Sequence, residues 1–136
     1  MKKKLILISA VFTMIICCLL MSACGNPNEA KINDYIKNNT AFSSMISTMQ
    51  TQYSEVMDIS AYGKGNDLVI EMKSLVELPE ESVSTMKDSD EFGVLAESLN
   101  PYITALRSEI GVSDANLIYI IKNSNGSEIV NKTIFG

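Results

Sequence analysis

Apolar residues follow several patterns along this chain, and each pattern predicts a different kind of element. Residues 5–20 form an uncharged and mostly apolar run. In residues 30–49 and 92–110 the apolar positions recur at intervals of three and four, which is typical of a helix with one buried face. Shorter runs with alternating or β-branched residues predict strands, and they span residues 56–62, 68–73, 117–122 and 128–135.

Turn residues separate the members of each strand pair. Gly63 to Asp67 lies within the first pair, and Asn125 with Gly126 lies within the second, so each pair predicts a β-hairpin. Pro79 predicts the start of a helix between the hairpins. Because hairpins pair locally and antiparallel, we expect an α+β domain whose four-stranded antiparallel sheet comes from two β-hairpins, with the helices packed on one face.

The N-terminal run has the layout of an export signal. Three lysines precede it, and the small residues Ser22 and Ala23 follow it directly before Cys24. We therefore expect a signal peptide over residues 1–23 with cleavage between Ala23 and Cys24, a tether over 24–30 and a single domain over 31–136. The alternative is an uncleaved transmembrane helix, because residues 5–23 are about long enough to cross a bilayer.

Residues 21–24 resemble the lipobox of bacterial lipoproteins, with Met21 where that family prefers leucine. The resemblance implies a thioether-linked diacylglycerol on Cys24, which becomes the first residue of the mature chain. It also implies a protein held at the cell membrane by lipid and facing the extracytoplasmic side. Cys17 and Cys18 would leave with the leader, so the mature domain would contain no free thiol.

Composition and charge exclude several classes of protein. The leader holds three of the 11 basic residues and none of the 16 acidic ones, which leaves the mature chain with eight basic groups and a net charge of −8. That sign argues against nucleic acid as a partner. The chain has no histidine, so it has neither a Ser/His/Asp triad nor an ordinary zinc site.

Three groups of residues are candidates for chemistry or binding. Glu77, Glu80 and Glu81 could supply paired carboxylates, although their position around Pro79 predicts an exposed helix start. Asp88, Asp90 and Glu91 could bind calcium, but the further oxygen ligands and the glycine of a calcium loop do not follow, so we expect no metal and no cofactor. Tyr62 and Tyr119 could form an interaction face on the sheet, provided that both are exposed and adjacent.

The chain resembles a family of small Gram-positive lipoproteins of uncharacterised function. The resemblance rests on the lipobox, the hairpin of residues 61–69, the helix end at residues 109–112 and the closing Asn125–Gly126 turn. It implies an architecture and no activity. We expect a membrane-anchored binding module for a protein partner or envelope component, with a carboxylate-based hydrolase and a structural or lipid-handling accessory protein as alternatives.

Overall fold

Two asparagines begin the first two helices of the computed structural model, which describes residues 25–88 and 92–134. The Asn26 side chain accepts a hydrogen bond from the Asn28 N–H (2.9 Å) and starts α2, Pro27–Asn38. Asn39 accepts from the Phe42 N–H (2.9 Å) and starts α3, Thr40–Tyr53. Because Asn26 and Pro27 are a favourable N-cap and first helical residue, α2 begins inside the segment expected to be a tether.

The first hairpin forms where the sequence predicts it. β1, Met57–Lys64, pairs antiparallel with β2, Asp67–Ser74, through a tight turn in which Gly65 has a φ of 63°. Glycine adopts this left-handed conformation without the steric cost that a Cβ would add.

Two helices connect this hairpin to the second one. α4, Glu80–Asp88, precedes α5, Phe92–Ser108, and α5 stays continuous through the exposed Pro101. After α5 the chain reverses at Gly111, whose φ is 77°, and the Val112 N–H donates to the Leu106 carbonyl (2.9 Å). β3, Leu117–Lys122, and β4, Glu128–Ile134, then form the second antiparallel hairpin.

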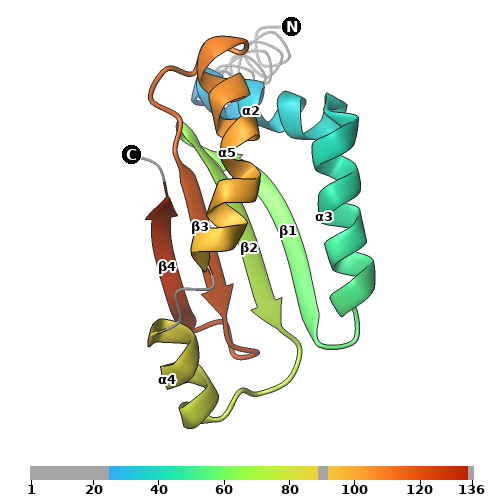
Figure 1. The fold of residues 1–136 in the computed structure, drawn as a ribbon, viewed down its shortest axis with the longest axis vertical. Helices are drawn as coiled ribbons and strands as arrows, with labels where there is room; N and C mark the ends of the chain where they lie inside the picture. Colours follow the sequence, from blue (N-terminus) through green and yellow to red (C-terminus); the bar gives the residue numbers. More distant parts are fainter. Residues whose placement is uncertain (1–24, 89–91, 135–136) are drawn as a thin grey trace, which may run out of the picture.

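The expected fully antiparallel sheet is wrong. The strand order is β1-β2-β3-β4, and β2 pairs with β3 in parallel, so the sheet is mixed. The reason is the connection: α4 and α5 carry the chain from the end of β2 back to the level at which β2 begins, and β3 then runs in the direction of β2 (Figure 1). The fold class remains α+β.

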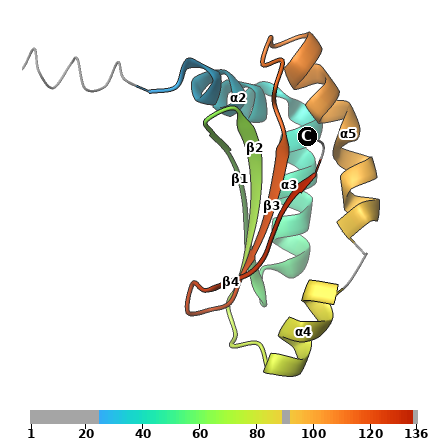
Figure 2. The same ribbon diagram turned by 90° about the vertical axis from the view of Figure 1, so that its left-hand side faces the viewer.

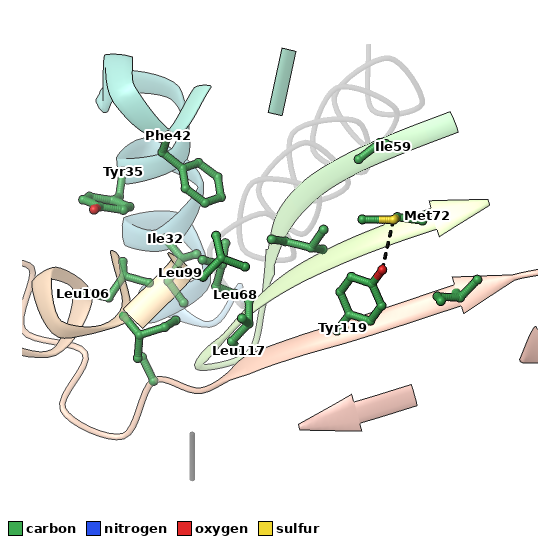
Figure 3. Close-up of a cluster of buried hydrophobic side chains, with 14 of the residues drawn as sticks. Ile32, Tyr35, Phe42, Ile59, Leu68, Met72, Leu99, Leu106, Leu117 and Tyr119 are labelled. Atoms are coloured by element: carbon green, nitrogen blue, oxygen red, sulfur yellow. Dashed lines mark hydrogen bonds between the residues drawn. The ribbon is translucent and has the colours of Figure 1, made fainter. Parts of the chain in front are cut away.

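The long helices lie on one side of the sheet. Viewed along the sheet, α3 and α5 stand on the same side, and none of the helices described lies on the other face (Figure 2). The core fills the space between these layers with Ile32, Phe42, Leu99 and Leu106 from the helices and Leu68 and Leu117 from β2 and β3, all of them fully buried (Figure 3). The Phe42 and Tyr102 rings meet edge to face at 5.0 Å, which joins α3 to α5.

Candidate functional site

The open face of the sheet carries a polar cluster that spans three strands. The Glu71 Oε2 atom on β2 accepts a hydrogen bond from the Tyr62 hydroxyl on β1 (2.9 Å) and an ion-paired hydrogen bond from the Lys122 Nζ atom on β3 (3.0 Å). The bond from Lys122 is the main cause that lowers the pKa of Glu71; burial opposes it, and the bond from Tyr62 lowers the pKa further. Burial and the bond to Glu71 raise the pKa of Tyr62 to about 12.

Tyr119 does not join Tyr62 on this face. Val69 pairs with both Tyr62 and Ile118, so Tyr119, one residue further along β3, points to the opposite side of the sheet. There it is 3% exposed, and its hydroxyl donates to the Met72 sulfur (3.1 Å; Figure 3). Burial raises the pKa of Tyr119 to about 12. The structure therefore does not bring the two predicted tyrosines together as an exposed surface.

The exposed apolar residues gather instead at one end of the sheet. Within residues 25–88 and 97–134, the exposed large apolar side chains are Tyr53, Val56, Leu75 and Val76, with exposed fractions between 43% and 52%. Tyr53 ends α3, Val56 precedes β1, and Leu75 and Val76 follow β2. We call residues 53–58 and 74–78 the distal tip. Its two segments meet at the lower end of the sheet, opposite α2 (Figure 1).

Hydrogen bonds fix the backbone of the distal tip. The Leu75 N–H donates to the Val56 carbonyl (2.9 Å), which extends the β1–β2 pairing beyond Met57 and Ser74. The Ser74 hydroxyl donates to the Val76 carbonyl (2.6 Å) and accepts from the Val76 N–H (3.3 Å). These bonds hold Leu75 and Val76 in a defined backbone conformation at the surface.

Asn123, on the β3–β4 loop, holds the end of the same segment. Its Oδ1 atom accepts from the Leu78 N–H (3.0 Å). Asn123 and Ser74 are the buried polar side chains of the described residues, at 9% and 1% exposure, and both bond to this tip. Because a buried polar group is costly unless it is hydrogen-bonded, the tip is held by interactions that would be expensive to break.

The surroundings of the distal tip are acidic. Residues 53–58 and 75–81 contain five carboxylates and no lysine or arginine, and all five are exposed. They are Glu55, Asp58, Glu77, Glu80 and Glu81. A cleft of about 440 Å³ adjoins them, lined by residues of the 77–87 segment, Lys87 among them, and by Asn123. The tip thus combines exposed apolar side chains with a negative rim.

Sequence reasoning did not single out Leu75 or Val76. The available signal was two apolar residues in succession after an alternating strand and before Pro79. Such a pair is also compatible with a buried loop. Its exposure depends on Ser74 and on Asn123, which lies far away in sequence, and no local pattern predicts that contact.

A second cleft lies at the other end of the molecule. It measures about 410 Å³ and is formed by residues 31–39 of α2 and the following linker together with Ile110. Tyr35 lies in this cleft, and burial, followed by the nearby Tyr102 and Glu109, raises its pKa. A lipid-handling protein would need an apolar cavity between its helices and its sheet, and neither of these two clefts lies there.

Several predicted sites lie outside the described residues. They include Ala23, Cys24, Asp90 and Glu91. Within the part that the structure describes, no group of three acidic, cysteine or histidine residues is placed to hold a metal ion. None of the helices described is both long and apolar enough to cross a membrane.

The carboxylates proposed for hydrolysis lie at the surface, and Glu77 and Glu80 line the cleft beside the tip. Glu77, Glu80 and Glu81 are exposed, and no aspartate or glutamate is buried among residues 25–88 and 97–134. An acid–base pair needs one carboxyl whose pKa is raised by burial or by a like charge. The partly buried carboxyl of Glu71 has a lowered pKa, which is the opposite of what a general acid needs.

These features define a small α+β domain with a mixed four-stranded sheet, helices on one face and an exposed apolar tip. Residues 32–134 match the DUF4854 family, a domain of unknown function, and the chain belongs to this family. No curated protein and no solved structure matches the chain. The matched residues cover the sheet, α3, α4 and α5, and the part of α2 from Ile32 onward.

Proposed function

We propose that this protein is a lipid-anchored extracytoplasmic binding module, held at the membrane by diacylglycerol on Cys24 and contacting a protein partner through its distal tip. The observation that carries the proposal is the position of the exposed apolar side chains at the end of the sheet farthest from α2. Apolar side chains that stay exposed together at one site mark interaction surfaces more often than single exposed residues do.

The beginning of the described chain lies at the opposite end. Asn66, in the β1–β2 turn, accepts hydrogen bonds from the side chains of Asn26 (3.3 Å) and Asn28 (3.0 Å). The tip lies at the other ends of β1 and β2, which are eight residues long, or about 25 Å at the usual rise per residue. A lipid on Cys24 would therefore leave the tip pointing away from the membrane surface.

The anchor is tested by the substitution Cys24→Ser in the full chain. Without the thiol there is no site for the lipid, so we expect the protein to leave the membrane fraction or to be mislocalised. Fractionation of cells that express the wild-type and the variant chain measures this. Unchanged retention of the variant would contradict the lipid anchor and favour the uncleaved transmembrane helix over residues 5–23.

Binding through the tip is tested by photo-cross-linking in intact cells. A photo-reactive phenylalanine analogue is placed at Val76 in the full chain, and at Thr133, an exposed residue on β4, as the matched control. We expect a discrete cross-linked protein product from position 76 that is absent from position 133. Equal products from both positions, or no product from position 76, would contradict a binding role for the tip.

A further inference from the structure

We infer that the distal tip docks a cationic protein segment that presents apolar side chains between its lysines or arginines. This inference rests on the proposed function and specifies the chemistry of the partner. An apolar side chain of the segment packs on Leu75 and Val76, and its cationic groups face the carboxylates around them.

The charge of the tip selects this partner. Glu55, Asp58 and Glu77 flank the four exposed apolar residues, and Glu80 and Glu81 continue the acidic surface on α4. The nearby cations are Lys73, which lies opposite Asp58 in the strand register, Lys122, which lies opposite Lys73 and is ion-paired with Glu71, and Lys87, which lines the adjoining cleft. The excess of negative charge attracts a basic segment and steers its approach.

The same negative charge argues against a second copy of this chain as the partner that binds the tip. Two tips placed face to face would bring together five carboxylates from each copy. Like charges brought together at an interface cost several kcal/mol. Self-association through the tip is therefore opposed by the same groups that favour a basic partner.

A lipid surface is also a poor occupant. The tip lies about 25 Å from the beginning of α2 along strands of eight residues, so a short lipid tether at Cys24 holds it away from the bilayer. A surface of anionic lipids would repel its carboxylates as well. A protein segment can reach the tip from the extracytoplasmic side without either obstacle.

The tip is suited to docking because its backbone is already ordered. The Leu75 N–H and both backbone groups of Val76 are hydrogen-bonded, and the Leu78 N–H bonds to the buried Asn123. A partner would therefore not have to order this loop on binding, which lowers the entropic cost of association.

The test uses the full lipidated chain in vesicles of neutral phosphatidylcholine and three fluorescent decapeptides. One peptide combines lysines with leucines, the second has serine for leucine, and the third has glutamate for lysine. Fluorescence anisotropy measures binding, and protein-free vesicles correct for partition into the lipid. We expect the lysine–leucine peptide to bind and the other two to bind at least about tenfold more weakly.

Two sets of variants locate the binding. The double substitution L75S/V76S should weaken binding of the lysine–leucine peptide by about tenfold or more, because the apolar surface is lost. The double substitution E55Q/E77Q should weaken binding of this peptide by about fivefold and make the binding less dependent on salt. E97Q/E109Q removes the same charge from exposed positions elsewhere and should leave binding unchanged. Circular dichroism of each variant checks that the fold is kept.

The inference is overturned by any of three results: equal binding of the glutamate–leucine peptide, unchanged binding by folded L75S/V76S, or no binding of the lysine–leucine peptide up to about 1 mM. Failure of these peptides while Val76 still cross-links a protein in cells would reject the partner chemistry and leave the proposed function standing. Loss of the cross-link at Val76, or retention of Cys24→Ser in the membrane, would reject the proposed function itself.

Discussion

At the scale of single residues, one oxygen atom of Glu71 joins three neighbouring strands. The Tyr62 hydroxyl and the Lys122 ammonium group both donate to it, from β1 and β3 respectively. The side chains of Lys122 and Glu71 are 27% and 20% exposed, so the pair is partly shielded from water. Lys122 therefore joins the second hairpin to the first by an ion pair in addition to the backbone pairing of β2 and β3.

The substitution Glu71→Gln tests this pair. It keeps an oxygen acceptor but removes the charge, and we expect the free energy of unfolding at pH 7 to fall by about 0.5–1 kcal/mol. The folded-state pKa of Glu71 lies below the ordinary value of 4.5. The contribution of the ionised Glu71 to the free energy of unfolding is therefore complete above pH 4.5 and is lost as the pH falls through the folded-state pKa. Urea unfolding at pH 7 and at pH 3 measures both effects.

The matched control for this prediction is Glu97→Gln, an exposed position on α5. We expect it to change the free energy of unfolding by less than about 0.5 kcal/mol. A difference between wild type and Glu71→Gln that persists undiminished at pH 3 would mean that lost charge is not the cause.

At the scale of elements, α2 packs against β1 at a glycine. A Cβ atom on Gly63 would lie 2.8 Å from the Glu29 carbonyl oxygen, closer than such atoms approach in proteins, and 3.0 Å from the Ile32 Cβ atom, which is also unusually tight. The Gly63 N–H also donates to the Asn33 side chain on α2 (2.8 Å). On the same edge, the Ile59 N–H donates to Gln50 on α3. Helix side chains thus satisfy outward amides of β1 that would otherwise be open to pairing with another strand.

The substitution Gly63→Ala should therefore destabilise the domain. The added methyl group meets backbone and a buried side chain that cannot move independently, and we expect a loss of about 1–3 kcal/mol in the free energy of unfolding. Thermal or urea unfolding of the full chain in detergent micelles measures it. At Gly25, where a Cβ would meet nothing within 4 Å, alanine is the control, and an equal loss there would contradict this explanation.

The elements also show how far the sequence determines this fold. Both hairpins were predictable because their turns, at Gly65 and at Gly126, are local and need glycine at positive φ. The parallel pairing of β2 with β3 was not predictable, because it depends on how α4 and α5 cross the sheet. The relative faces of Tyr62 and Tyr119 depend on that same pairing and its register. The tip was missed for a related reason, since Asn123 holds it from the second hairpin.

At the scale of the whole molecule, the sheet separates two ends with different surfaces. At one end, α2 is tied to the β1–β2 turn by the contacts of Asn66 and by the bond from the Gly65 N–H to the Glu29 carboxylate (3.0 Å). At the other end, the apolar and acidic tip faces outward. The proposed lipid on Cys24 lies two residues before Asn26, so the link between lipid and α2 is about 7 Å at full extension. So short a link should keep the first end at the membrane.

Lipid-bound quenchers can measure this orientation. Under the proposed cleavage before Cys24, the chain has no other cysteine, so Lys64→Cys, beside the β1–β2 turn, and Leu75→Cys, at the tip, each introduce a single thiol for a fluorophore. With nitroxide headgroups on the lipids, we expect strong quenching at position 64 and little at position 75, because contact quenching does not extend over the roughly 25 Å between the ends of β1. Equal quenching at both positions would mean that the sheet lies flat on the membrane. Stronger quenching at 75 would mean that the tip is buried in lipid, and the apolar residues there would then serve the membrane and not a protein partner.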